Sequence, residues 1–338
     1  MSAARKAGAG VAFAGVTASA LRALRWRTRA DLRGCGALVT GGSRGLGLLI
    51  ARELGRCGCR VAICARDGEE LERAARRLAG DVSEVVTLTG DVGDRDQARD
   101  LVARAAQRLR RLDVVVNNAG VIQVGPYGRQ TEENMRQAMD VMFWGPYHVT
   151  AAAVPYLERA GHGRVINITS IGGRISVPHL LPYSCAKFAA TGLSAGLHAE
   201  LAARGVRVMT VTPGLMRTGS QLNATFTGDA EYVWFGLSAS LPLISMDAER
   251  AARRIVTASR ENRAHLTLTP VARLGAMAEG VAPGLTARAM AVADRVLPSG
   301  EDTGATTTRG RAADDRLGSP VFAMATRLGR AAARRFNQ

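Results

Sequence analysis

The stretch G-A-L-V-T-G-G-S-R-G-L-G, residues 36–47, predicts a short buried strand, a glycine turn and the start of a helix. Glycine lets the backbone approach a pyrophosphate closely, and the free N–H groups of a helix N-terminus attract an anion. A glycine cluster alone is often only a turn, but one placed between a strand and a helix indicates a dinucleotide site. We expect that site to include Gly41, Ser43, Arg44, Gly45, Leu46 and Gly47.

The next predicted strand, 60–65, bears on which dinucleotide would bind. It ends in Arg66-Asp67, about twenty residues after the glycines. An acidic residue here would hold a ribose 2′-hydroxyl, whereas an arginine accommodates a 2′-phosphate. Arg66, together with Arg44 in the glycine turn, favours NADP(H) over NAD(H), although Asp67 also fits the NAD(H) pattern.

Strand and helix patterns alternate along most of the remaining chain. We expect strands at 84–89, 113–116, 164–169 and 207–212, with a weaker one at 265–269. Helical patterns separate them at 69–78, 94–109, 131–159 and 183–203. This alternation predicts an α/β fold with one doubly wound parallel sheet and helices on both faces. Ligands of such sheets bind at the carboxyl ends of the strands.

Three residues near the end of the 164–169 strand are candidates for catalysis. Tyr183 and Lys187 are four residues apart, so a helix places them on one face, where the ammonium would lower the pKa of the phenol. Ser170 stands thirteen residues before Tyr183, at the strand end. A tyrosine whose pKa is lowered can act as a general acid or base. The lysine is also unusual, because the chain has only one other, Lys6, against 43 arginines.

The net charge of +16 lies mostly in the two ends of the chain. Residues 1–34 carry seven basic groups and one acidic group, and residues 303–338 carry seven and two, which together account for +11. The body between them is only mildly basic, so we expect no nucleic-acid partner. The five cysteines form neither a disulfide framework nor a zinc motif, so we expect no metal site.

Together these motifs resemble the short-chain dehydrogenase/reductase (SDR) family of NAD(P)-dependent oxidoreductases. Over residues 32–269 they follow the order and spacing of that family: Thr40 to Gly47, Asp91-Val92, Asn117 to Gly120, Ser170, Tyr183-x-x-x-Lys187, Pro213-Gly214 and Thr218. The resemblance implies a single Rossmann-like domain. It also adds to the cofactor site Asp91, Val92, Asn118, Ala119, Gly120, Tyr183, Lys187, Pro213, Gly214 and Thr218.

The resemblance also implies a mechanism. Tyr183 would donate a proton to a carbonyl oxygen or remove one from an alcohol. Ser170 would position that oxygen, and Lys187 would bind the nicotinamide ribose and lower the pKa of the tyrosine. The cofactor would carry out the hydride transfer, and the protein would supply alignment and proton transfer.

One position departs from the family pattern. SDR enzymes usually carry an asparagine three residues before the glycine that is Gly145 here, and this chain has Met142. A thioether cannot donate a hydrogen bond. We expect either a different water relay or reduced turnover, with the acid/base group itself intact.

The segment after Pro213 is where relatives in this family hold a mobile substrate lid. It is rich in large apolar residues, including the aromatic residues Phe226, Tyr232, Trp234 and Phe235. Apolar linings suit hydrophobic ligands. We therefore expect a small apolar carbonyl or alcohol substrate, such as a fatty-acyl, steroid-like or retinoid-like compound. The alternative is that these side chains only pack the lid onto the domain or a partner.

Extensions flank the predicted domain on both sides. We expect a basic leader at 1–31, the Rossmann-like domain at 32–270 and a C-terminal extension at 271–338. The extension should hold helices at 271–277, 285–297 and 321–336 and a flexible stretch at 299–319. No apolar run reaches the ~20 residues that cross a bilayer. We expect a cytoplasmic protein whose basic tails could contact a membrane surface, and family habit suggests a homodimer or homotetramer.

Two other functions stay open. A catalytically weak NADP(H)-binding sensor or scaffold would fit Met142 and the extensions, but it would not need a serine, a tyrosine and a lysine arranged for proton transfer. An epimerase or dehydratase of the extended relatives would usually show Gly-x-x-Gly-x-x-Gly. This chain instead spaces its glycines as Gly41-x-x-x-Gly45-x-Gly47.

Overall fold

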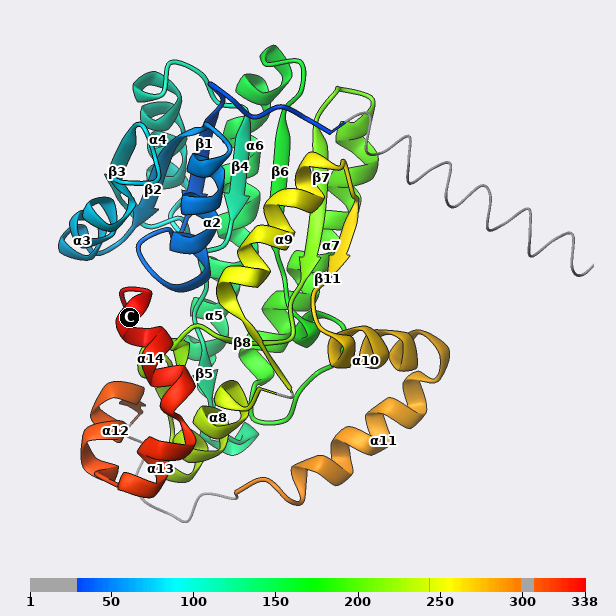
Figure 1. Cartoon of the computed structure of the whole chain (residues 1–338). Helices are drawn as coiled ribbons and strands as arrows, with labels where there is room; N and C mark the ends of the chain where they lie inside the picture. Colours follow the sequence, from blue (N-terminus) through cyan, green and yellow to red (C-terminus); the bar gives the residue numbers. More distant parts are fainter. Residues whose placement is uncertain (1–28, 243, 299–306) are drawn as a thin grey trace, which may run out of the picture.

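The computed structural model describes residues 29–242, 244–298 and 307–338, so nearly all of the predicted leader lies outside it. Its centre is a seven-stranded sheet in the order β11-β7-β6-β4-β1-β2-β3, with every neighbouring pair parallel (Figure 1). The predicted α/β class and doubly wound sheet are confirmed. The strands are β1 (Gly36–Thr40), β2 (Arg60–Ala65), β3 (Val85–Thr89), β4 (Val114–Asn117), β6 (Arg164–Ile168), β7 (Arg207–Thr212) and β11 (His265–Thr267).

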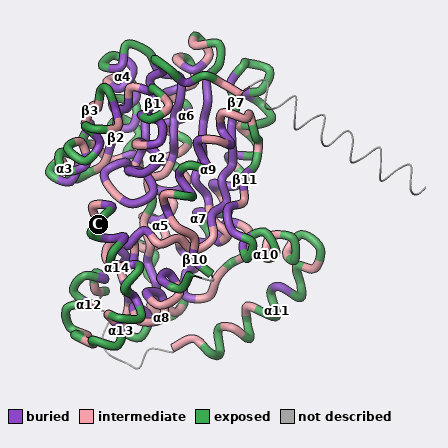
Figure 2. Tube along the Cα trace, in the orientation of Figure 1, coloured by how far each residue is buried: buried purple, intermediate pink, exposed green. Residues whose placement is uncertain are grey.

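Apolar side chains on both faces explain why these segments form central strands. Every residue of β1 and β4 is buried, as Figure 2 shows for the middle of the sheet. A strand covered on both faces needs a continuous apolar run rather than alternation. One face packs against α2 (Gly45–Arg56), α3 (Gly68–Leu78) and α9 (Ala248–Arg260). The other packs against α4 (Arg95–Arg108), α6 (Gly145–Arg159) and α7 (Leu181–Ala202).

Short acidic side chains begin several of these helices. Asp67 accepts a hydrogen bond from the backbone N–H of Glu70 at the start of α3, and Asp94 and Asp247 cap α4 and α9 in the same way. Helix α2 has no side-chain cap. The backbone N–H groups at its start, beside the glycine turn, must therefore find other partners.

The helix predicted over 131–159 contains an irregular turn. Helix α5 (Glu132–Met139) is followed by a π-helical turn at Asp140–Trp144 and then by α6. Single π-helical turns inside α-helices occur frequently at functional sites. Here the turn carries Met142 and faces the candidate site described below.

A second, smaller core lies below the carboxyl ends of the strands. A three-stranded sheet of β5 (Gln123–Val124), β9 (Thr225–Phe226) and β12 (Thr308–Arg309) packs with α8 (Asp229–Ser240), α12 (Gly310–Leu317) and α13 (Pro320–Ala325). The flexible stretch predicted at 299–319 is therefore wrong over 308–317. The reason is a long-range contact: Ala313 is buried in this core, and Asp314 accepts a hydrogen bond of 2.8 Å from the Tyr232 hydroxyl.

The remaining C-terminal elements form an arm and a return to the main domain. Helices α10 (Pro270–Val281) and α11 (Pro283–Asp294) extend away from the body and expose apolar side chains such as Leu274 and Leu285 (Figure 1). The helix predicted at 321–336 is broken at Thr326 into α13 and α14 (Arg327–Arg335). Among the described helices, none is long and apolar enough to cross a membrane.

Candidate active site

The glycine turn between β1 and α2 approaches β4 so closely that side chains are excluded. Gly41 and Gly45 both have positive φ, +59° and +55°. A Cβ on Gly47 would lie 2.1 Å from the Gly41 carbonyl oxygen, so only glycine fits there. The amide nitrogen of the Asn118 side chain donates to the carbonyls of Thr40 and Gly41, at 3.1 and 3.0 Å. The sequence places Asn118 at the cofactor, and the structure shows that its amide also holds the turn.

A cavity of about 750 Å³ opens at the carboxyl ends of the strands, between the glycine turn and the start of α7. This volume lies in the range of small-molecule and cofactor sites. The glycine turn lines this cavity through Gly41, Ser43, Arg44 and Gly45, and a glycine-rich backbone at a helix start suits a bound pyrophosphate. The cavity is lined by every predicted site residue except Gly47: Gly41, Ser43, Arg44, Gly45, Leu46, Arg66, Asp91, Val92, Asn118, Ala119, Gly120, Ser170, Tyr183, Lys187, Pro213, Gly214 and Thr218.

Two arginines and three acidic residues surround the end of β2. The Arg66 side chain is more than half exposed, and its Nη1 lies 3.7 Å from an Asp91 carboxylate oxygen. The guanidinium of Arg44 donates to Glu70 at 2.8 Å. The carboxylate of Asp67 is engaged in capping α3, where it accepts the Glu70 backbone N–H at 2.9 Å. Asp67 thus caps α3 through one carboxylate oxygen, and both Asp67 and Arg66 line the cavity.

Ser170, Tyr183 and Lys187 come together at the other end of the cavity. Ser170 follows β6, and its hydroxyl oxygen accepts the Gly172 backbone N–H at 3.0 Å. The same hydroxyl hydrogen-bonds the Tyr183 phenol. The Lys187 ammonium lies 5.7 Å from the centre of the Tyr183 ring and donates to the Ile168 carbonyl at 2.9 Å. The helix start at α7 and the end of β6 thus place one hydroxyl, one phenol and one ammonium around a common space.

The expected lowering of the tyrosine pKa by the lysine is not found in this structure. Burial raises the pKa of the Tyr183 phenol, and the hydrogen bond from Ser170 is the opposing influence. Burial also lowers the pKa of Lys187 to about 8. The physical reason is desolvation, which disfavours the charged form of both groups. The ammonium is directed to a backbone carbonyl and lies over the face of the ring.

Met142 is buried at the position where the family usually has asparagine. It belongs to the π-helical turn, with only 1% of its surface exposed. A Cβ on Gly120 would meet its sulfur at 3.6 Å, so the thioether packs beneath the wall of the cavity. A sulfur in this place cannot donate a hydrogen bond toward Lys187 or toward a water.

The lid aromatics do not line the cavity. Phe226, Tyr232 and Phe235 pack against one another and against Phe322 in the smaller core. The alternative that these side chains pack the lid onto the protein is therefore what the structure shows. The cavity is lined instead by the apolar residues Val121, Ile122, Val141, Ile168, Met216 and Ala224.

Residues 336–338, which we name the clasp, reach the glycine turn from the far end of the chain. The Phe336 carbonyl accepts the Gly45 backbone N–H at 2.9 Å, and the Asn337 side chain donates to the Ser43 carbonyl at 2.8 Å. The Gln338 side chain lines the cavity and accepts a hydrogen bond from Asn223 at 2.7 Å. No motif in the sequence indicates this contact, since it joins segments about 290 residues apart.

One group of side chains elsewhere brings three potential metal-ligand atoms together. Cys35, Asp113 and His162 have ligand atoms within 4.8 Å of one another, in a search of the described residues. Both carboxylate oxygens of Asp113 are bound by the Arg111 guanidinium, at 2.6 and 2.7 Å. A cation would have to displace that arginine, so we assign no metal to this group.

A family model, similar proteins and a solved structure all indicate the same family. The family model described as short chain dehydrogenase matches residues 36–227. The chain is 38% identical over 187 residues to a Streptomyces violaceoruber protein whose name assigns it as ketoacyl reductase 1 of the granaticin polyketide synthase, covering 54% of this chain and 68% of that protein. It is 28% identical over 281 residues to dehydrogenase/reductase SDR family member 7B of Bos taurus, covering 81% and 86%.

A solved structure shares the fold as well. A short-chain dehydrogenase from Streptomyces avermitilis superposes with a TM-score of 0.66 at 28% identity, over 77% of this chain and 96% of that one. The chain therefore belongs to the short-chain dehydrogenase/reductase family, and it is an enzyme of this oxidoreductase class.

Proposed function

We propose that this protein is an NADP(H)-dependent oxidoreductase that interconverts an apolar alcohol and its ketone or aldehyde, with Tyr183 as the general acid/base. The observation that carries the proposal is one continuous cavity with the glycine turn at one end and Ser170, Tyr183 and Lys187 at the other. When bound, the nicotinamide supplies or accepts the hydride. The protein residues orient the substrate oxygen and transfer its proton.

In the direction of reduction, Tyr183 gives its proton to the carbonyl oxygen of the substrate. Burial keeps the phenol protonated at neutral pH, which suits a proton donor. The Ser170 oxygen accepts the Gly172 N–H, and its hydroxyl bonds the Tyr183 phenol. When substrate binds, the Ser170 hydrogen would turn from the phenol to the substrate oxygen and hold that oxygen beside Tyr183. Lys187, fixed by the Ile168 carbonyl, would bind the ribose next to the nicotinamide and return a proton to the tyrosine.

The preference for NADP(H) rests on the charges at the end of β2. Arg66 faces the cavity and is close to a single carboxylate, that of Asp91. Arg44 lines the same cavity from the glycine turn, where its guanidinium is paired with Glu70. A 2′-phosphate would offer both guanidinium groups a doubly charged partner. One oxygen of Asp67 is used to cap α3, which leaves a single oxygen for a ribose hydroxyl and weakens the case for NAD(H).

The proposal of an apolar substrate now rests on the cavity wall rather than on the lid aromatics. The wall near Tyr183 carries aliphatic side chains, among them Val121, Ile122 and Met216. Gln123 and Gln137 also line the cavity, and the Gln123 side chain donates a hydrogen bond of 2.7 Å to that of Gln137. This bond satisfies one polar group of each side chain. The ketoacyl reductase named among the relatives acts at a ketone on an acyl chain, which agrees with this class of substrate.

The clasp would form part of the cofactor site. It ties the Ser43 carbonyl, the Gly45 N–H and Asn223 to one short segment. Through these bonds it fixes the turn that would receive the pyrophosphate and walls the cavity with Gln338. We infer that the clasp strengthens cofactor binding by holding the turn in shape.

Association with other molecules is also proposed. Helices α6 and α7 and the π-helical turn expose Trp144, Tyr147 and Phe188. These faces would pair two or four copies of the chain. In the C-terminal helix, Arg330 and Arg335 are engaged in ion pairs with Asp314 and Glu249, so a peripheral membrane contact would depend on the leader and on the α10–α11 arm.

Tyr183→Phe should abolish turnover while sparing cofactor binding. Loss of the acid/base group should lower kcat about 10²- to 10⁴-fold. The measurement is NADPH oxidation, followed by absorbance, with a series of ketones of increasing chain length, and NADPH titration of both proteins. For the wild type, kcat/KM should rise with chain length. Tyr127→Phe, at an exposed site, is the matched control. Full activity in Tyr183→Phe, or equal rates with small polar and long-chain ketones, would contradict the proposal.

Arg66→Gln should reduce the preference for NADPH. Losing one charge-assisted bond to the 2′-phosphate should lower kcat/KM for NADPH about tenfold or more and leave the value for NADH nearly unchanged. Steady-state kinetics with both cofactors measures this ratio. Arg73→Gln, on the exposed face of α3, removes the same charge as a control. An equal loss with NADPH and NADH would show that Arg66 does not read the phosphate.

Asn337→Ala should weaken NADPH binding about three- to tenfold, because the glycine turn loses a hydrogen bond that shapes it. Fluorescence titration measures the dissociation constant, and a melting curve checks the fold. Arg334→Gln, on the exposed side of α14, serves as the control. Unchanged or tighter binding by Asn337→Ala would refute a supporting role for the clasp.

Lys187→Met should stabilise the protein without nucleotide, and the gain should depend on pH. Lys187 titrates near 8 when folded and near 10.5 when unfolded, so the folded state carries the full penalty of a buried ammonium below about pH 8. Between about pH 8 and pH 10.5, Lys187 is deprotonated in the folded protein but still protonated in the unfolded chain. The penalty for burying its charge therefore disappears as the pH rises. Urea unfolding should therefore show a gap of up to about 3 kcal/mol near pH 7 that shrinks toward pH 10. A gap that does not change with pH would contradict this assignment.

A further inference from the structure

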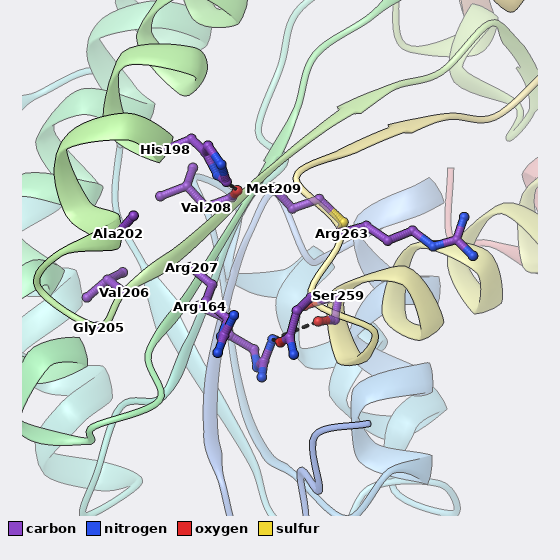
Figure 3. Close-up of a pocket in the computed structure, with 11 residues that line it drawn as sticks. Arg164, His198, Ala202, Gly205, Val206, Arg207, Val208, Met209, Ser259 and Arg263 are labelled. Carbon is purple, nitrogen blue, oxygen red and sulfur yellow. Dashed lines mark hydrogen bonds between the residues drawn. The ribbon is translucent and has the colours of Figure 1, made fainter. Parts of the chain in front are cut away.

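A second cavity lies at the opposite edge of the sheet from the active site (Figure 3). Ser170 and Pro213 follow the carboxyl ends of β6 and β7, whereas this cavity of about 160 Å³ lies where those two strands begin. Its size is well above the roughly 15 Å³ that one water needs. It is lined by Arg164, His198, Ala202, Gly205, Val206, Arg207, Val208, Met209, Ser259, Asn262 and Arg263, and none of these carries a carboxylate.

Two of the lining arginines are direct neighbours. Arg164 and Arg207 are the first residues of β6 and β7 and pair in register across the parallel strands, so their side chains leave the same face of the sheet. Figure 3 shows both side chains extending into the same region, whereas Arg263 points away from them. Arg207 is exposed at the rim, and Arg164, with 4% of its surface exposed, forms the floor.

Arg164 is a buried charge without a counter-ion among the described residues. Both of its side-chain hydrogen bonds come from Nη1, to the Ser259 carbonyl at 2.7 Å and to the Asn262 side chain at 2.8 Å. Its Nε is buried with no partner in the described part of the chain. Burial, with Arg207 beside it, lowers its pKa to about 10, so it is still charged at neutral pH. A buried charge is costly unless an opposite charge or further hydrogen bonds compensate it.

The nearby carboxylates are already committed. Glu261 pairs with Arg263 at 2.8 Å and also with Arg29 at 3.6 Å. Asp113, whose carbonyl bonds the Arg164 backbone N–H, has both side-chain oxygens on Arg111. The fold therefore holds two adjacent guanidinium groups at a cavity, and the described part of the chain supplies no anion to neutralise them.

We propose that this cavity binds a small tetrahedral oxyanion, inorganic phosphate or a phosphate monoester, between the guanidinium groups of Arg164 and Arg207. The donors of a guanidinium group match the oxygens of a phosphate in geometry. A single water cannot neutralise the charge of the group. A dianion compensates both charges at once, which a monocarboxylate would not. The site uses none of the residues assigned to the cofactor, so it does not depend on the proposed function.

The test is calorimetric titration of the full chain with inorganic phosphate at constant ionic strength. The wild type should bind one phosphate. In Arg207→Gln the affinity for phosphate should be at least about tenfold lower than in the wild type. Arg207 is exposed, so this change should leave the fold intact, and a melting curve verifies it. Arg253→Gln, on the exposed side of α9, removes the same charge outside the cavity, and Arg66→Gln removes a candidate phosphate ligand of the cofactor site.

Retention of the phosphate site in both control variants and its loss in Arg207→Gln would establish the proposal. Equal binding by Arg207→Gln and wild type, or a response in the wild type that does not saturate, would overturn it. A parallel titration with glycerol 3-phosphate identifies the source of the anion. Tighter binding than inorganic phosphate indicates an esterified ligand, and weaker binding indicates the free ion.

Discussion

The contact between the glycine turn and β4 is the constraint on which the rest of the structure depends. Asn118 donates from its side chain to the carbonyls of Thr40 and Gly41, while the Thr40 hydroxyl oxygen accepts the backbone N–H groups of Asn118 and Ala119. These bonds fix the end of β1 against the end of β4 and so set where α2 begins. Because Gly47 can approach Gly41 without a side chain, α2 begins at the cavity, where the Gly45 N–H is bonded to the Phe336 carbonyl.

The same edge of the sheet carries groups that are expensive to bury. Lys187 is buried and Tyr183 is partly buried, and the pKa of each moves toward the neutral form. Two large apolar clusters, one on each face of the sheet, stabilise the fold and offset the free-energy cost of burying these groups. A site that needs a buried ammonium must be anchored by its surroundings, and here the Ile168 carbonyl provides the anchor.

Local patterns were enough to predict much of the fold, whereas contacts between distant segments were not. The bounds of β2 and β7 were predicted to the residue, because each is a short run of apolar residues, with threonines in β7, that begins with an arginine. Helix α9 was missed, although the Asp247 cap and the buried face of Ala251, Ala252 and Ile255 carry the usual helical signal.

Other features depend on the folded surroundings and could not be read from spacing. The order in α12 comes from the bond between Tyr232 and Asp314, 82 residues apart. The clasp meets the glycine turn only in the folded chain. The direction of the tyrosine pKa follows from burial, which a four-residue spacing does not report. The lid aromatics were assigned to the substrate because composition cannot tell a core from a cavity wall.

The most direct test of the account is a crystal structure of the protein with NADP⁺ bound. The account predicts the pyrophosphate at the glycine turn, the 2′-phosphate beside Arg66, and the nicotinamide ring next to Tyr183, with Lys187 on its ribose. A dinucleotide bound elsewhere, or one whose nicotinamide lies away from Tyr183 and Ser170, would contradict it.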